Sequence, residues 1–283
     1  MKQYILACID TKENAKGVCD AAIYFANLLG AGVTLLYALE QSDDLEINIT
    51  INPNFEPKVF EEFAKHKEQE EQAKDKDGKE LLNYYQKYCE NAGVIANTLH
   101  LHGDLANLIT IIEKDYKLLV VGKLLDNEQD LQIKEIIKSV NLPILLANKD
   151  FHPINKALYA YDGSDNLDKA LNKVLVNPLF KNASRVLIHL SKDEKKAKEI
   201  LEKGKKVFDK YNKAISLEIL DRTSPSDLVD YAHNNNFDII VMGAYKNMAI
   251  KHIIFGSFTN EVLKKSKLPL LILKNYKEFE IGI

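Results

Sequence analysis

Residues 238–273 read DIIVMGAYKNMAIKHIIFGSFTNEVLKKSKLPLLIL, and this stretch decides the fold. It opens with an apolar run that Gly243 closes, and it ends with a second apolar run, LPLLIL (268–273). Between the two runs, Val262 and Leu263 belong to a segment with helical periodicity. Unbroken apolar runs separated by a helix are typical of strands buried in a parallel sheet. The stretch therefore predicts a strand, a helix and a second strand of an α/β protein.

The first half of the chain carries a second version of this unit. KLLVVG (117–122) also closes with glycine, and LPILLA (142–147) corresponds to LPLLIL. Each unit ends a longer series that begins with a strand containing or followed by aspartate, YILACID (4–10) or ALYAYDGS (157–164). Two further strands are predicted within each series, at 33–39 and 94–101 and at 185–191 and 214–220. Helices separate these strands, and one of them begins with the N-cap pattern of Ser224, where proline and then an acid follow.

We therefore predict two tandem α/β domains, residues 1–150 and 155–283. Each is expected to hold an open five-stranded, mostly parallel sheet with helices on both faces. An insertion at 41–57 occurs only in the first repeat, and its Asn, Asp and Pro content fits either an ordered flap or a mobile loop.

Composition indicates a soluble globular protein. Hydrophobic residues make up 46% of the chain and charged residues 28%. No apolar run approaches the ~18 residues of a membrane helix, and the N-terminal segment is expected to be a strand rather than a signal peptide. The three cysteines have no metal-type spacing and are expected to be reduced thiols in a cytoplasmic protein. We expect neither a membrane nor a nucleic acid as partner.

The two halves differ in charge. Residues 1–150 hold 16 Lys+Arg against 25 Asp+Glu, and residues 151–283 hold 22 against 16. A basic half could favour anionic ligands, and opposite charges could help the halves dock. Neutral sequence drift at solvent-exposed positions explains the difference in charge between the halves equally well.

The second half carries a candidate ligand site. In open α/β sheets, ligands bind at the carboxyl ends of strands where the strand order reverses. An order of 3-2-1-4-5 would place Asp162 and Gly243 on either side of one crevice. Gly256 and Ser257 stand at the start of a helix, where backbone N–H groups, a hydroxyl and the positive end of the helix dipole suit a phosphate. The alternative is that this pair only caps the helix and allows close packing.

These residues resemble the motif G-x2-G-x9-G-[ST] of the universal stress protein family, with Gly243, Gly256 and Ser257 at the expected spacing. The segment VLKKSKLPLLILK (262–274) is also similar to that family. The resemblance implies the 3-2-1-4-5 order and ATP or a related adenine nucleotide as ligand, with or without Mg²⁺. Lys246 stands where the second glycine belongs, and its side chain could hinder the loop or add a contact to phosphate.

The resemblance also implies roles for individual residues. Asp162 would contact the nucleoside and Leu190 would line the base pocket. The glycine loop and the start of the helix would hold ribose and phosphates, through Gly243, Gly256, Ser257, Phe258 and Thr259.

The first half departs further from the motif. Gly122 is followed by Pro143 after 21 residues, against 26 from Gly243 to Pro269. The shortened loop places the carboxylate of Asp130 near where phosphate would lie, and like charges repel. We therefore expect a degenerate site in the first domain and treat Asp10 as a strand-end remnant.

Three histidines lie in predicted strands and are candidates for a metal-binding or a structural role. His100 and His102 share one face of a predicted strand, and metal ligation is conceivable. With no third ligand expected nearby, a structural role is expected instead. His189 is expected to be a hydrogen-bonded core residue.

The resulting hypothesis is a cytoplasmic tandem universal stress protein that acts as a nucleotide-binding sensor or regulator in a stress response, with one competent site in the second domain. The alternative is a scaffold or small-molecule-binding protein that does not bind nucleotide and acts through protein–protein contacts. Enzymatic activity is not expected beyond slow ATP hydrolysis, because no residue is evident to position water or Mg²⁺.

The last strands also predict an assembly. Strand five is an edge in the 3-2-1-4-5 order, and an exposed apolar edge favours pairing. Members of the family commonly dimerise through this strand. We expect 142–147 and 268–273 to meet within one chain as a pseudo-twofold dimer, and a further homodimer is an additional hypothesis.

Overall fold

The computed structural model describes residues 4–39, 57–123, 127–244 and 257–274, without the side chains of 57–67 and 127–130. Nearly all of the insertion predicted at 41–57 lies outside the described residues. So do Lys246 and Gly256 of the predicted site.

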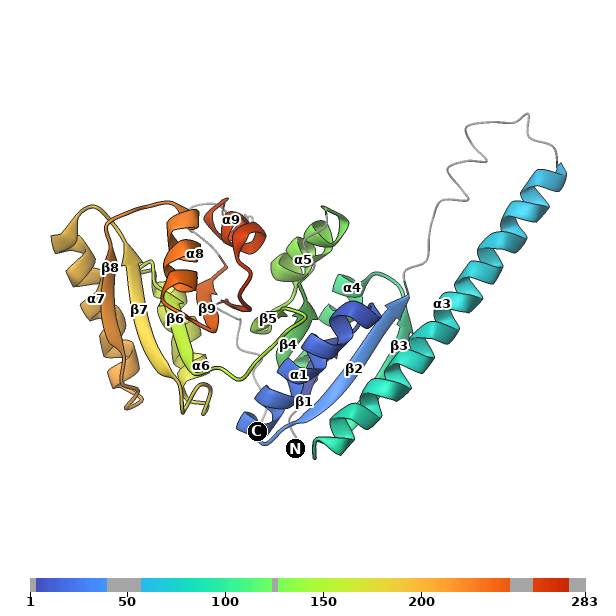
Figure 1. Ribbon diagram of the computed structural model, residues 1–283, viewed down its shortest axis with the longest axis horizontal. Helices are drawn as coiled ribbons and strands as arrows, with labels where there is room; N and C mark the ends of the chain where they lie inside the picture. The colour runs from blue at the N-terminus through green and yellow to red at the C-terminus, as the bar shows by residue number, and fades with distance from the viewer. Residues whose placement is uncertain (1–3, 40–56, 124–126, 245–256, 275–283) are drawn as a thin grey trace.

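Each half of the chain alternates strands and helices (Figure 1). The elements of the first half are β1 (Tyr4–Cys8), α1 (Lys12–Leu29), β2 (Gly32–Leu39), α3 (Pro57–Asn91), β3 (Ala96–His102), α4 (Leu105–Ile112), the short 3-10 helix η1 (Glu113–Asp115), β4 (Tyr116–Gly122), α5 (Asn127–Ser139) and β5 (Ile144–Ala147). Those of the second half are β6 (Lys156–Ala160), α6 (Asp165–Leu175), β7 (Ser184–Leu190), α7 (Glu194–Asp209), β8 (Ser216–Leu220), α8 (Pro225–Asn234), β9 (Ile239–Gly243), α9 (Ser257–Lys265) and β10 (Leu270–Leu273).

The strands form one ten-stranded sheet in the order β3-β2-β1-β4-β5-β10-β9-β6-β7-β8. Within each half the order is therefore the expected 3-2-1-4-5. Each half thus contributes the expected five strands, and the two sheets are joined into one because β5 and β10 pair antiparallel. All other strand pairs are parallel.

The pairing of β5 with β10 removes two apolar edges from water. Leu145 lies opposite Leu271, and both side chains are fully buried. An unpaired edge of this kind would expose backbone N–H and C=O groups along with its leucines. The two segments predicted to meet, 142–147 and 268–273, thus contact each other in a defined register.

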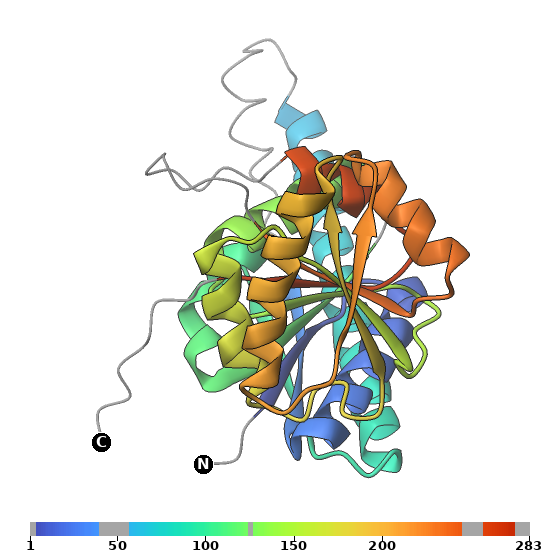
Figure 2. The same ribbon diagram turned by 90° about the vertical axis from the view of Figure 1, so that its left-hand side faces the viewer.

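Helices cover both faces of the sheet, and Figure 2 shows the strands fanning out with the twist expected of such a sheet. One face packs against α1, α3, α6 and α7 through a single apolar cluster that includes Phe25, Leu81, Leu171 and Phe208. The other face packs against α4, α5, α8 and α9 through a cluster that includes Ile109, Ile136, Leu228 and Val262. Each cluster contains residues of both halves, so the two cores are continuous across the chain.

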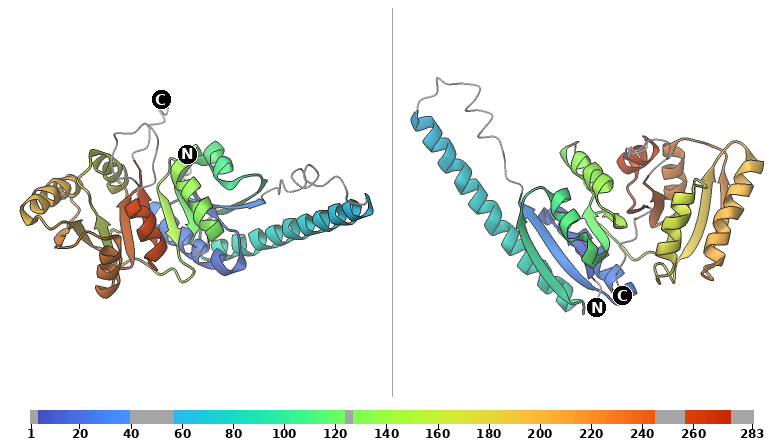
Figure 3. Two further views of the ribbon diagram at one scale, coloured as in Figure 1. Left: turned by 90° about the horizontal axis from the view of Figure 1, so that it is seen from above. Right: turned by 180° about the vertical axis from the view of Figure 1, so that it is seen from behind.

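Local sequence fixes the ends of several helices. The N-cap predicted at Ser224 is confirmed: Ser224 and Asp227 form a capping box, with proline at the first helical positions of α8. In α1, Thr11 caps the N-terminus and Gly30 adopts a left-handed φ of 62° at the C-terminus. The first turns of α3 extend beyond the end of the sheet (Figures 1 and 3).

Side chains tie the halves together beside the sheet. Phe25 of α1 meets the edge of Phe180 at a ring-centroid distance of 5.7 Å. The ammonium of Lys123 donates to the carbonyl oxygen of Ser266, and that of Lys274 donates to the carbonyl oxygen of Val140 at 2.5 Å. Burial lowers the pKa of each lysine to about 8. No helix in the described part of the chain is long and apolar enough to cross a membrane.

Candidate functional site

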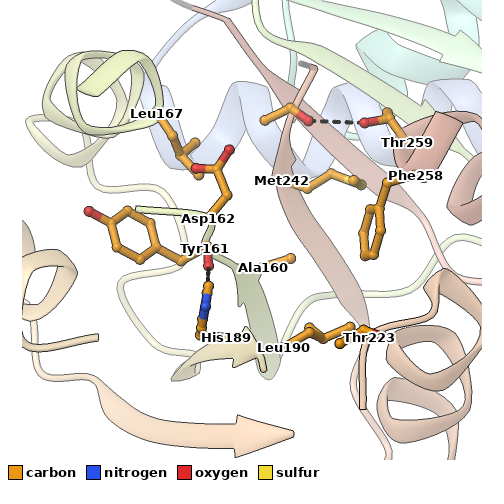
Figure 4. Close-up of a pocket in the computed structure, with 11 residues that line it drawn as sticks. Ala160, Tyr161, Asp162, Leu167, His189, Leu190, Thr223, Met242, Phe258 and Thr259 are labelled. Atoms are coloured by element: carbon orange, nitrogen blue, oxygen red, sulfur yellow. Dashed lines mark hydrogen bonds between the residues drawn. The ribbon is translucent and has the colours of Figure 1, made fainter. Parts of the chain in front are cut away.

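A cavity of about 220 Å³ opens at the carboxyl ends of β6, β7 and β9 (Figure 4). The chain leaves β6 toward β7 on one side and returns through β9 on the other, so the cavity lies at the reversal of strand order. Its described lining residues are Ala160, Tyr161, Asp162, Leu167, His189, Leu190, Thr223, Met242, Gly243, Phe258 and Thr259.

Five of the predicted site residues line this one cavity. They are Asp162, Leu190, Gly243, Phe258 and Thr259, and they come from four separate segments of the chain. Ser257 is exposed at the first position of α9, next to Phe258. Lys246 and Gly256 lie outside the described residues.

Asp162 is exposed at the end of β6, and a tight turn fixes its carboxylate. Oδ1 accepts a hydrogen bond of 2.9 Å from the backbone N–H of Ser164. Gly163 between them has a φ of 79°, which residues with a Cβ rarely adopt. Ser164 in turn caps α6, because its Oγ accepts a hydrogen bond of 3.3 Å from the backbone N–H of Leu167. The turn therefore presents the carboxylate at the cavity while starting the next helix.

Gly243 leaves space that the surrounding protein does not fill. A Cβ at this position would lie 3.6 Å from Leu167 Cδ1, which is an ordinary van der Waals contact. The φ of Gly243 is not in the left-handed region. Among the described residues, neither packing nor backbone conformation requires glycine here, and the missing side chain enlarges the cavity.

The start of α9 is held against the end of β9. Thr259 is buried, and its hydroxyl donates to the carbonyl oxygen of Gly243 at 3.4 Å (Figure 4). The first N–H groups of a helix carry partial positive charge. The contact therefore holds an electropositive helix terminus beside the cavity.

His189 combines a structural contact with a place on the cavity wall. Its Nδ1 lies 2.7 Å from the carbonyl oxygen of Tyr161. A carbonyl oxygen only accepts, so Nδ1 is the donor of this hydrogen bond. The expected hydrogen bond is confirmed, but the residue is half-buried and lines the cavity rather than lying wholly in the core.

Sequence reasoning missed most of the apolar wall. Ala160, Leu167 and Met242 are ordinary core-type residues in the sequence, and nothing in their identity distinguishes them. For Ala160 and Met242 the available signal was their position at strand ends, because carboxyl ends of parallel strands meet at one edge, whereas Leu167 lies in the first turn of α6. Thr223 follows the end of β8 and carries the same signal.

The cavity holds little catalytic chemistry. Asp162 is its only carboxylate among the described lining residues, and these include no lysine or arginine. The hydroxyl of Tyr161 donates to Asp168 instead of being available to a ligand, and burial with this contact raises the pKa of the phenol. Asp162 and His189 therefore remain as the titratable side chains of the described lining that could contact a ligand.

The equivalent crevice of the first half is almost closed. It measures about 20 Å³ and is lined by Cys8, Ile9, Asp10, Leu36, Leu105, Val121, Gly122, Gln132 and Ile133. A Cβ on Gly122 would lie only 3.1 Å from Asn14 Cβ, so this glycine serves close packing. The two crevices occupy corresponding places in the sheet but differ about tenfold in volume.

These features define the chain as a doubly wound α/β protein with a ligand-sized crevice where the strand order reverses. Residues 153–274 match the model of the universal stress protein family. Universal stress protein Slr1230 of Synechocystis is 25% identical over 284 residues, covering 95% of this chain and 99% of that protein. The second half of the chain therefore matches the universal stress protein family, and the chain as a whole is similar in length and sequence to a universal stress protein.

Solved structures share the architecture along nearly the whole chain. A universal stress protein from Archaeoglobus fulgidus superimposes with a TM-score of 0.72 at 18% identity, over 97% of both chains. A universal stress protein from Pseudomonas aeruginosa gives a TM-score of 0.63 at 14% identity, over 96% of this chain and 93% of that one. At these identities the likeness concerns the fold.

Proposed function

We propose that this protein is a nucleotide-binding sensor or regulator in a stress response and that its second half, residues 155–283, holds the competent site for ATP or a related adenine nucleotide. One observation carries the proposal: five residues chosen from the sequence as nucleotide contacts line a single 220 Å³ cavity at the reversal of strand order.

The cavity suits the nucleoside part of such a ligand. Leu190, Met242 and Phe258 provide apolar surface for a planar base. Asp162 supplies a carboxylate that can accept from a ribose hydroxyl or a base amino group. The volume lies below the roughly 300–1,000 Å³ of typical small-molecule sites. The phosphates would therefore lie at the mouth, toward Ser257 and the first turn of α9.

The first half, residues 1–150, would act as a structural partner without a competent nucleotide site. Its crevice of about 20 Å³ has no room for a nucleoside. Within this proposal, the pairing of β5 with β10 is the intramolecular counterpart of a dimer interface.

The residues that line the cavity favour ligand binding over catalysis as its function. A regulator that responds to nucleotide concentration needs an equilibrium site, and Asp162 alone cannot supply both a base and a set of Mg²⁺ ligands. We place this function in the cytoplasm, where adenine nucleotides are abundant.

Calorimetric titration of the full chain with ATP, ADP, AMP and cyclic AMP tests the proposal. We expect one site per chain, with binding strongly reduced in Asp162→Ala. Asp10→Ala, which changes the aspartate that lines the small crevice of the first half, is the matched control and should bind like the wild type. A folded wild-type protein that gives no binding at millimolar nucleotide would exclude this function.

A further inference from the structure

Three potential metal ligands meet at the opposite end of the molecule from the cavity. Asp75 lies in the middle of α3, and His100 and His102 lie on β3, the outer strand of the sheet. His100 Nδ1 is 3.5 Å from Asp75 Oδ1, and His102 Nε2 is 3.6 Å from the same oxygen. One ligand atom from each residue lies within 4.8 Å of the other two. The expectation that the two histidines have no third ligand nearby was wrong, because the fold brings α3 across β3.

The spacing fits a shared ion better than direct hydrogen bonds. Separations of 3.5 and 3.6 Å are long for hydrogen bonds between side chains. A tetrahedral ion with bonds of ~2.0–2.1 Å holds its ligand atoms roughly 3.3–3.4 Å apart. Small movements of the side chains would therefore close the site around such an ion.

The surroundings orient the ligands and leave access. Lys79 Nζ binds Asp75 Oδ2 at 2.6 Å, so one carboxylate oxygen is held while Oδ1 faces the histidines. Nδ1 is the nitrogen of His100 that faces Asp75, whereas its buried Nε2 has no hydrogen-bond partner among the described residues. The side chain of His102 is 49% exposed, which provides an entry path and room for a further ligand such as water.

We propose that Asp75, His100 and His102 form a three-ligand site for a divalent transition-metal ion of the zinc type, with the remaining position open to solvent. Two imidazoles and one carboxylate are the ligand set that zinc and its neighbours accept when they keep an open position. The ion would link the middle of α3 to the edge strand β3, so binding would raise the melting temperature of the protein.

The test uses the untagged full chain after dialysis against a chelator. Titration with Co²⁺ should give the visible absorption of a low-coordinate cobalt site, saturating at one ion per chain, and Zn²⁺ should displace it. Zn²⁺ should also raise the melting temperature. Removing a ligand by His102→Ala or Asp75→Asn should weaken Zn²⁺ binding by at least about 100-fold.

Matched controls separate this site from surface binding. His152→Ala removes an exposed histidine elsewhere, and Asp77→Asn removes a nearby charge of α3. Both should bind like the wild type. Circular dichroism verifies that every variant is folded, which is expected because His102 and Asp75 are not core residues. The proposal is overturned if the folded wild type shows no saturable binding, or if His102→Ala binds as tightly as the wild type.

Discussion

The glycine that ends β9 offers a sharp test of the cavity. Replacing Gly243 with alanine adds one methyl group whose carbon would lie 3.6 Å from Leu167 Cδ1. That distance is an ordinary contact, so the protein itself should accept the change. Since the backbone φ is also accessible to alanine, the variant should be as stable as the wild type or more stable by about 0.4–1 kcal/mol.

Ligand binding should respond differently. Gly243 lines the 220 Å³ cavity together with Leu167, so the methyl group takes space from the ligand and not from the protein. Overpacking by one methyl group costs about 1–3 kcal/mol, which corresponds to a loss of roughly 5- to 150-fold in nucleotide affinity.

Gly122→Ala is the matched control, because Gly122 ends β4 at the corresponding place in the first half. There a Cβ would lie 3.1 Å from Asn14 Cβ. This variant should lose about 1–3 kcal/mol of stability and keep wild-type nucleotide affinity. Thermal unfolding and calorimetric titration of both variants measure the two quantities. A folded Gly243→Ala protein with unchanged affinity would refute the reasoning, and so would weakened binding in Gly122→Ala.

Three further predictions concern stability. Lys123 has a pKa lowered to about 8 from 10.5, so between those values the unfolded chain binds more protons and the folded state gains stability as pH rises. From pH 7 to 9.5 the wild type should gain roughly 2 kcal/mol relative to Lys123→Met in urea unfolding, and equal slopes would contradict this. Phe25→Ala should cost about 3–5 kcal/mol because Phe25 is fully buried against Phe180, whereas Val176→Ala, 64% exposed, should change stability by under ~0.5 kcal/mol. Ser224→Ala removes the capping box of α8 and should cost about 1 kcal/mol, with Ser224→Thr retaining most of the stability.

The arrangement of strands was predictable because its signals are local. Apolar runs such as 117–122 and 238–243 are buried on both faces and read as strands without reference to the rest of the chain. The repeat then strengthened these predictions, because the same order of strands and helices occurs in both halves. The apolar last strands predicted that β5 and β10 would meet. A single continuous sheet also depends on how these two edges, which are distant in the sequence, pair with each other, and the sequence supported this pairing as a hypothesis.

The candidate site was predictable where residue identity is unusual for its position. Asp162 at a strand end and Gly243 before a loop stand out in the sequence. Leu167 and Met242 do not, because a residue that lines a cavity and one that fills a core look alike. The triad of Asp75, His100 and His102 was missed for another reason: a helix residue and an edge strand meet only through tertiary packing, which spacing along the chain does not encode.

The residue that follows β4 in the first half and the residue that follows β9 in the second half occupy equivalent positions but have different roles. The backbone N–H of Lys123 donates to the last residue of β5, and that of Ala244 donates to the last residue of β10, so the two residues are equivalent in the sheet. Lys123 sends its side chain across to Ser266 and ties the halves together, while the short side chain of Ala244 leaves the end of β9 to the cavity. One strand end therefore contributes to the junction of the halves, and its counterpart borders the larger cavity. The first half supplies the Lys123 contact at the junction, and the second half holds the larger cavity. The asymmetry of the crevices and the continuity of the sheet both follow from this division of roles.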